Sequence, residues 1–272
     1  MTRWLGLIAI YLLLILIALV MVGPFLWLLS TSLKVGQDLF QFPPDLLPHP
    51  PSLANYLKVW QSLQIPRYIL NTLELTVSGL LLNLTLASMA GYALARLRFP
   101  GRDAIFYAIV ATLILPNGAG LIVNYLTIVH LHLANTLTGV VLPSAVNAVD
   151  IFIMRQAFLG IPQELEDAAR VDGAGELYLW AKIMLPLVRP ALATVAIFEF
   201  VGFWNIFLWP LIVLQNASRY PLAVALAYLN GQFADNFAVV AAGTVISILP
   251  VIVVFLILQR QFISGLTGAL KL

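Results

Sequence analysis

Two acidic residues of this chain stand in or beside long apolar runs, where a charge is costly. Glu199 interrupts the run from Pro190 to Gln215, and Asp150 ends the run from Ala104 to Val149. An ionisable group inside a membrane is retained by a partner or by a role in moving solutes, ions or protons, so both are functional candidates. Glu199 follows Pro190 by nine residues, about 13 Å along a helix, which predicts a position near mid-membrane.

The spacing leaves two interpretations of Glu199 open. It could line a solute pathway and accept hydrogen bonds from sugar hydroxyls, or it could pair with a group on a neighbouring helix. Asp150 lies five residues before Arg155. It is therefore expected near the cytoplasmic boundary, paired with a base or reaching toward water.

Polar and aromatic residues in the same runs are further pathway candidates. Amides in apolar helices can contact a solute or hold helices together, and an indole can stack on a sugar ring or anchor the chain at the interface. Both roles are open for Asn83, Asn147, Asn205, Trp204 and Trp209.

A second group of chemistry-bearing residues is concentrated between 164 and 172, which hold four of the twelve acidic residues. Pro162 suits the first position of a helix, and the acids that follow it favour a helix N-terminus. Asp172-Gly173 is a strong turn signal, so the helix is expected to end there. Arg170 can pair with Glu166 or Asp167 one turn earlier. A second short helix is expected from about 175 to 184, which makes the unit helix, glycine turn, helix.

Small side chains around this turn would let the surface of another protein approach closely. The alternative is an amphipathic loop that lies on the membrane, and spacing does not decide between them. The candidates for contact with a partner are Glu164, Glu166, Asp167, Ala168, Ala169, Arg170, Asp172, Gly173 and Ala174, with the acids and Arg170 at the rim.

The composition places these residues in a membrane protein. Of the 272 residues, 61% are hydrophobic and only 10% are charged, which lies outside the range of soluble domains. The absence of cysteine excludes disulfides and thiolate ligands, and three scattered histidines indicate no metal site. We expect neither a catalytic residue nor a metal.

The apolar runs predict a single all-α transmembrane domain over 1–272. Uniformly apolar runs of about 20 residues or more suit helices, whereas barrel strands need alternating polarity. In the six-span arrangement, ten Lys and Arg residues lie on one side of the membrane and four on the other. Because basic residues are retained on the cytoplasmic side, both termini are expected in the cytoplasm. The expected spans are 4–33, 72–95, 104–129, 134–155, 187–214 and 237–260, with a turn near His130 to Asn135, a proline-rich outer segment 34–71 containing a short amphipathic helix, and a cytoplasmic loop 160–186.

The stretch "IPQELEDAARVDGAGELYLWAKIMLPLVRPAL" resembles the EAA loop of binding-protein-dependent ATP-binding-cassette (ABC) importer permeases, in particular the maltose-type carbohydrate branch. The stretches "LANYL", "YALARLRFPGR", "FWNIFLWPLIVL" and "FISGLTGALK" are similar to the same family, so the resemblance covers nearly the whole chain. Two positions depart from it: Asp167 stands where Glu is usual, and Ile206 stands where relatives often carry an acid.

The resemblance implies the shorter, six-span permease subunit of an ATP-driven importer for a sugar, glycoside or related polyol. The loop from Glu164 to Lys182 would form a coupling helix seated in a cleft of an ATPase subunit, with Gly173 as pivot. None of the four lysines follows a glycine, so the chain has no phosphate-binding loop. ATP and Mg are therefore expected on partner chains.

The expected assembly is a heterodimer with a second permease, two ATPase subunits and an external solute-binding protein, in a bacterial inner membrane. A proton-coupled secondary transporter is the alternative, since it would also carry buried acids. An intramembrane protease pairing Asp150 with Glu199 is disfavoured, because the depth argument places the two carboxylates at different levels and no G-x-S-x-G or H-E-x-x-H pattern is present.

Overall fold

The computed structural model describes residues 2–35, 47–62, 64–116, 118–233 and 236–269, and over these ranges every regular element is helical. The chain forms two compact units, one of residues 1–65 and 225–249 and one of residues 66–224 and 250–272. The predicted all-α class is confirmed.

The first unit contains α1 (Thr2–Ser32), α2 (Ala54–Ser62), most of α13 (Leu222–Gln232) and the first part of α14 (Phe237–Ala269). The predicted short helix of the outer segment is α2. Its Asn55 amide donates to the carbonyls of Ser32 (2.9 Å) and Lys34 (2.7 Å), which attaches α2 to the end of α1. Part of the predicted proline-rich segment, including Pro43 and Pro44, lies outside the described residues.

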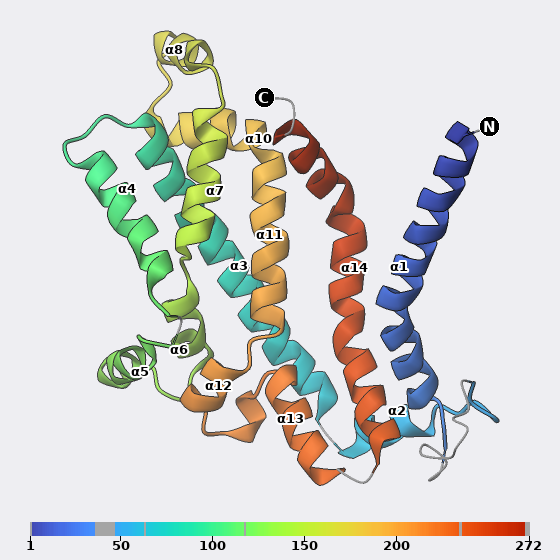
Figure 1. Ribbon diagram of the computed structural model, residues 1–272. Coiled ribbons are helices and arrows are strands. Elements are labelled where there is room, and N and C mark those ends of the chain that lie inside the picture. The colour runs from blue at the N-terminus through green and yellow to red at the C-terminus, as the bar shows by residue number, and fades with distance from the viewer. Residues whose placement is uncertain (1, 36–46, 63, 117, 234–235, 270–272) are drawn as a thin grey trace. The chain divides into compact units, whose positions relative to one another are not determined.

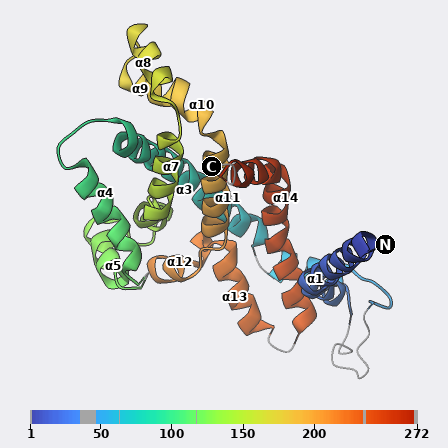
Figure 2. The ribbon, with the colours of Figure 1, turned by 45° about the horizontal axis from the view of Figure 1, so that its top comes forward.

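The second unit is built on four helices, the longest of which crosses the others obliquely (Figures 1 and 2). Two apolar clusters bind them together, because each helix turns apolar residues toward its neighbours, and a third cluster packs the short helices at one end against the longest of the four. The four helices are α3 (Ile65–Arg96), α4 (Arg102–Ala111), α7 (Ala148–Leu159) and α11 (Arg189–Trp204), with the short helices α5 (Leu121–His130), α6 (Leu137–Val141) and α12 (Leu208–Val213) at one end and α8 (Gln163–Val171) at the other.

A stripe of small residues brings α3 against α7. Ala87 and Ala95 are buried. A Cβ placed on Gly91 would lie 2.7 Å from the Cβ of Met154 and 2.9 Å from the backbone nitrogen of Arg155. Ala87, Gly91 and Ala95 therefore form a packing seam, and at Gly91 only glycine allows this close approach of the two helices.

Three helices in the described ranges are long and apolar enough to cross a membrane by themselves, and bent pairs raise the number to as many as five. The single long helices are Gly6–Ser32, Ile65–Arg96 and Phe237–Ile257. One bent pair, Leu137–Ser144 with Ala148–Leu159, turns by 51°. The other, Glu176–Leu187 with Arg189–Trp204, turns by 84°.

The other three expected spans are broken, which corrects the prediction of continuous helices. The first, 104–129, stops at Ile114 and resumes at Leu121, because Pro116 and two glycines follow the stop. The second, 134–155, breaks before α7, where Asn147 caps the new helix. The third, 187–214, breaks between Trp204 and Leu208. The turn expected near 130–135 is present, with His132 and Asn135 at positive φ.

Candidate functional site

The predicted helix–turn–helix of the polar loop is confirmed. Helix α8 begins directly after Pro162 and ends at Val171, with Asp172 in the C-cap position. Gly173 has φ +84°, its N–H donates to the Arg170 carbonyl (3.0 Å), and the N–H of Ala174 donates to the Ala169 carbonyl (3.0 Å). This pair of bonds is a Schellman cap, which needs a left-handed residue and so explains the glycine.

The second helix of the loop leads into the membrane at a sharp angle. It consists of α9 (Glu176–Tyr178), a π-helical turn (Leu179–Met184, η4) and α10 (Leu185–Leu187). Because it lies at 84° to α11, the loop helix runs across the direction of the span that follows it. The expected helix over 175–184 is therefore present and continues to Leu187.

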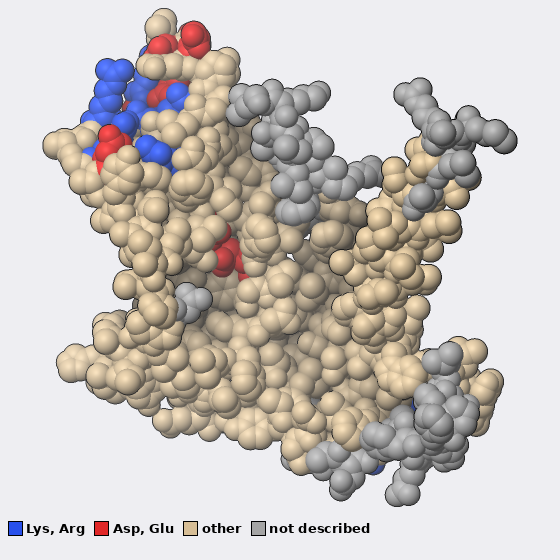
Figure 3. Space-filling model, in the orientation of Figure 1, with Lys and Arg blue, Asp and Glu red and all other residues tan. Residues whose placement is uncertain are grey.

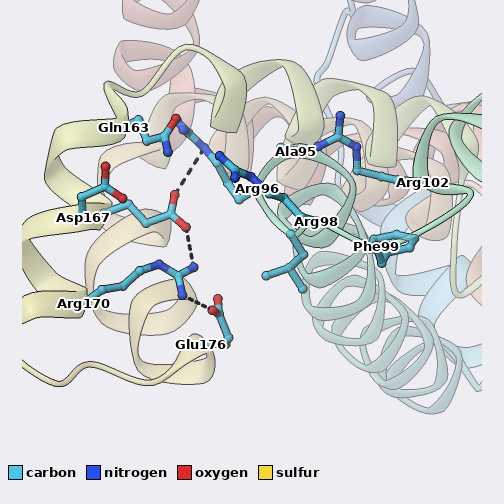
Figure 4. A pocket seen from close by; sticks show the side chains of 11 residues that line it. Ala95, Arg96, Arg98, Phe99, Arg102, Gln163, Asp167, Arg170 and Glu176 are labelled. Carbon is cyan, nitrogen blue, oxygen red and sulfur yellow. Dashed lines mark hydrogen bonds and ion pairs between the residues drawn. The ribbon is translucent and has the colours of Figure 1, made fainter.

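A chain of ionic contacts holds the loop together around Arg170. Its guanidinium donates to Oε1 of Glu166 (2.8 Å) and to Glu176 (Figure 4). The hydroxyl of Tyr92 donates to Oε2 of Glu176 (2.9 Å). The hydrogen bond from Arg170 holds the pKa of Glu176 below its ordinary value. The two acids raise the pKa of Arg170 in turn. The carboxylates and the guanidinium thus stabilise one another's charged forms.

The same chain continues into the helices of the second unit through Arg96, the last residue of α3. Its Nε lies 3.8 Å from Oε2 of Glu166, and its guanidinium donates to the carbonyls of Phe158 and Ile161 at the end of α7. The Arg96 side chain is only 10% exposed. Helix α8 is therefore bonded through charged side chains to the C-terminal ends of both α3 and α7.

The structure divides the predicted contact residues into two sets. Glu166 does not lie at the rim: it is 4% exposed, because it faces Arg96 and Arg170. Ala169 and Ala174 are half-buried against the cluster that contains Phe158. The outward set comprises Glu164, Asp167, Ala168, Asp172 and Gly173, all exposed. Between them stand two exposed apolar residues, Leu165 and Val171.

Sequence reasoning missed three members of this network, namely Tyr92, Arg96 and Glu176. Glu176 comes six residues after Arg170, beyond the reach of one helical turn, so only the glycine cap brings it back. It replaces Asp167 as the second partner of Arg170. The signal for Arg96 was present, since an arginine directly ends an apolar span and can reach back to neighbouring helix ends.

A groove of about 710 Å³ runs beside this network, between α8 and the segment that follows α3. Figure 4 shows Arg98, Phe99 and Arg102 across from Gln163 and Asp167. On the face in Figure 3, basic and acidic atoms gather at this end of the second unit.

A second polar site lies between α3, α7 and α11. Asp150 is 2% exposed and accepts a hydrogen bond from the Asn83 amide (Nδ2 to Oδ2, 3.0 Å). The carboxyl group of Glu199 lies close enough to that of Asp150 to interact with it, and the Asn147 side chain lies close enough to Glu199 to do the same. The oxygen of Asn147 caps α7 by accepting from the Val149 N–H (3.0 Å). Figure 3 shows a small acidic patch over α7 and α11.

This contact overturns two expectations about Asp150, its pairing with a base and its different depth from Glu199. The physical reason is the break before α7. Asp150 lies in the first turn of α7, nine residues or about 14 Å from Leu159, and Glu199 lies ten residues or about 15 Å from the start of α11. The two carboxyl groups therefore meet at the same depth. The nearby base, Arg155, turns to the Leu94 carbonyl and to Asp103.

A cavity of about 590 Å³ opens beside this pair. Its polar lining includes Glu199, Asn147, Ser144 and Thr112, and Ile206 stands at the position where the resemblance led us to note a missing acid. The other pathway candidates lie elsewhere. Trp204 is buried and stacks on Phe200, with 5.6 Å between the ring centres. The Asn205 amide donates to the Val201 carbonyl in its own helix. The Trp209 indole donates to the Gly139 carbonyl.

The chain that carries these two sites matches a known class of membrane protein. Residues 67–267 match the family model described as "Binding-protein-dependent transport system inner membrane component". The chain therefore belongs to this family of transporter subunits, the permeases of ABC importers.

Curated relatives cover the chain almost completely. The arabinooligosaccharides transport system permease protein AraQ of Bacillus subtilis is 36% identical over 97% of this chain and 95% of its own length. The diacetylchitobiose uptake system permease protein NgcG of Streptomyces coelicolor is 32% identical over 94% of this chain and 85% of its own. A chain of a bacterial ABC transporter involved in the import of the acidic polysaccharide alginate superposes with a TM-score of 0.84, at 30% identity, over 96% of this chain and 97% of that one.

Family membership decides among the classes considered from the sequence. The meeting of Asp150 and Glu199 removes the depth argument against an intramembrane protease. The match over 67–267 nevertheless assigns the chain to transport subunits and separates it from both proteases and proton-coupled carriers.

Proposed function

We propose that this chain is the membrane-spanning permease subunit of an ATP-driven importer for a sugar, glycoside or related polyol, and that it forms half of the translocation pathway. The relatives named for arabinooligosaccharides, diacetylchitobiose and lactose support the carbohydrate class. A relative named for sn-glycerol-3-phosphate supports the wider range.

The single observation that carries the coupling role is the attachment of α8. Its inward face is tied by Glu166 and Arg170 to Arg96 and Glu176, whereas its outward face presents exposed acidic, small and apolar residues around a glycine cap. A force applied to the outward face is transmitted through these bonds to the ends of α3 and α7. This arrangement suits a joint with an ATPase subunit better than a loop lying on the membrane.

The proposed assembly contains a second related permease, two ATPase subunits that bind ATP and Mg, and an external solute-binding protein, in a bacterial inner membrane. The family description as an inner membrane component supports this assembly. The fold also resembles, at 18% identity, a bacterial alginate ABC transporter in complex with an alginate pentasaccharide-bound periplasmic protein (TM-score 0.63).

Within the membrane we propose six crossings with both termini in the cytoplasm, three of them by broken helices. The distribution of Lys and Arg supports the orientation. The cavity beside Glu199, Asn147 and Ser144 is the proposed part of the solute pathway in this chain, since broken helices and polar groups at membrane depth are tolerated where they line a cavity.

The coupling role is tested by filling the outward face of α8. Ala168 is exposed and lies within the helix, so Ala168→Trp adds bulk at the proposed contact without disturbing the left-handed turn at Gly173. The matched control is Ala104→Trp, the same change at an exposed position of α4. We expect Ala168→Trp to lose co-purification of the ATPase, or to abolish solute-stimulated ATP hydrolysis, with normal membrane insertion.

Normal ATPase recovery and normal stimulated hydrolysis in Ala168→Trp would refute docking through this face. Equal loss in Ala104→Trp would show that the tryptophan disturbs insertion or folding generally. Hydrolysis is measured on the purified complex with the solute-binding protein and candidate sugars, so the same assay identifies the solute.

A further inference from the structure

The cavity of about 590 Å³ beside α7 and α11 offers no positive charge to a solute. The described residues that line it include no Lys, Arg or His, and their polar side chains are those of Thr112, Ser144, Asn147 and Glu199. The base on α7, Arg155, is engaged with the Leu94 carbonyl and Asp103. An anion that entered the cavity would lose water without meeting a counter-charge, which is costly.

The ends of two helices border the cavity, and neither replaces the missing base. The last turn of α11 contributes Gly202 and Phe203, which brings the negative end of its dipole to the cavity. The N-terminus of α7 has the opposite polarity. There, however, the Asn147 side chain takes the Val149 N–H, and Asp150 places a carboxyl group in the first turn. The cavity therefore suits groups that donate hydrogen bonds better than it suits anions.

The side chains of Asn147 and Glu199 match the hydrogen-bonding pattern of hydroxyl groups. The Oδ1 atom of Asn147 accepts from the Val149 N–H (3.0 Å), which leaves the amino group of the side chain as a donor. Glu199 contributes carboxyl oxygens that accept. Because a hydroxyl group both donates and accepts, a donor and an acceptor that line one cavity suit a solute with several hydroxyl groups.

Gly202 keeps the cavity wide beside Glu199. It follows Glu199 by three residues in α11 and lines the same cavity, so the two residues share one face of the helix. A Cβ placed on Gly202 would meet nothing within 4 Å. A larger side chain at this position would therefore enter the open space of the cavity instead of meeting a packed neighbour.

We propose that this cavity is a selectivity site for uncharged solutes rich in hydroxyl groups, in which Asn147 and Glu199 hydrogen-bond to the solute and Gly202 leaves room for it. The site disfavours uronates and phosphate esters, because it offers them no base. Through the proposed pathway role of the cavity, on which this assignment rests, the expected cargo narrows to neutral saccharides, glycosides and polyols. Phosphate esters, such as the sn-glycerol-3-phosphate in the name of one relative, are then excluded.

Selection by the membrane subunits is measured in the absence of the solute-binding protein, which makes a selection of its own. The assembled complex in lipid nanodiscs is mixed with two neutral probes, lactose and raffinose, and two anionic probes, digalacturonate and sn-glycerol-3-phosphate. Saturation-transfer difference NMR detects which probes contact the complex, and empty nanodiscs give the background. We expect about fivefold less transfer to the anionic probes, the effect of about one hydrogen bond. Equal or stronger transfer to them would overturn the proposal.

Variants of this chain separate its site from any site on the second permease. Asn147→Asp keeps an oxygen that can cap α7 but removes the amide donor, so transfer to the neutral probes is expected to fall about fivefold. Glu199→Gln adds an N–H donor, so the anionic probes are expected to gain relative to the neutral ones. Gly202→Leu fills the cavity and is expected to abolish transfer to the neutral probes. The matched control is Gly23→Leu, at a glycine of α1 where a Cβ also meets nothing within 4 Å.

Solute-stimulated ATP hydrolysis, measured with the solute-binding protein, distinguishes failure of this site from failure of the proposed function. Stimulation by a neutral saccharide with unchanged NMR transfer in all three variants would keep the importer and overturn the selectivity site. Absence of stimulation by any saccharide would refute the proposed function, whereas transfer that follows the variants would still support the site. If Asn147→Asp and Glu199→Gln do not assemble, Gly202→Leu decides, because it changes no polar group.

Discussion

Arg170 holds the two helices of the polar loop together. Its planar guanidinium donates to Glu166 on its own helix and to Glu176 beyond the glycine cap at the same time. A fork of donors can serve two carboxylates in fixed directions, which a single ammonium on a flexible stem cannot do. The loop therefore depends on the type of base at this position as well as on its charge.

We expect Arg170→Lys to loosen the loop while preserving its net charge. The Arg170 side chain is 40% exposed, so solvent screening limits the loss to about 1 kcal/mol of stability. The larger effect is expected on coupling: solute-stimulated ATP hydrolysis should fall more than the basal rate. Both rates are measured on the purified complex.

Arg98→Lys serves as the comparison, since Arg98 is an exposed arginine on the other wall of the groove. An unchanged ratio of stimulated to basal hydrolysis in Arg170→Lys would contradict a role of the network in coupling. An equal fall in Arg98→Lys would assign the effect to the groove as a whole.

The packing of α3 against α7 determines the positions of both polar sites, the polar loop and the site around Asp150. The stripe of Ala87, Gly91 and Ala95 lets α3 approach α7 closely, and this approach positions Arg96 at the end of α7 and Asn83 beside Asp150. One packing contact thus supports both the polar loop and the site around Asp150. Substitutions in the stripe should affect both sites although they touch neither.

Gly91→Leu is expected to separate α3 from α7. Even a Cβ at this position meets Met154 at 2.7 Å, and overpacking of this kind costs about 1–3 kcal/mol or more. We expect a lower midpoint of thermal unfolding and weaker coupling, measured by thermal denaturation and by stimulated ATP hydrolysis. The control is Gly23→Ala in α1, where a Cβ meets nothing within 4 Å. A Gly91→Leu complex as stable as the wild type would refute the close seam.

At the scale of the whole molecule, the distribution of charge predicts which loops face which side. The chain contains no cysteine, so single cysteines can report exposure without background. Glu164 and Ala217 are both exposed, the first beside α8 and the second in the turn η5 (Ala217–Arg219) after α12.

We expect Ala217→Cys to react with an impermeant thiol reagent in intact spheroplasts and Glu164→Cys to react only after the membrane is opened. The cysteine-free chain provides the blank. Labelling of Glu164→Cys alone in intact spheroplasts would show that the chain has the opposite orientation in the membrane. Labelling of both cysteines in intact spheroplasts would show that the polar loop does not lie in the cytoplasm.

The sequence by itself determined the class of protein and the local form of its polar loop. Apolar runs, the count of Lys and Arg, Pro162 and Asp172-Gly173 act through composition and short spacing, so hydrophobicity and capping chemistry predict their effects. The α8 boundaries were predictable for this reason.

Only the tertiary structure decided which polar groups meet. Glu166 turns inward to Arg96 seventy residues away in the sequence, and Asp150 meets Glu199 because α7 begins after a break. These contacts depend on helix start points and on the close approach of α3, α7 and α11. A shift of a few residues in a helix start moves a side chain by several ångströms and to another face, so composition and local spacing do not determine them.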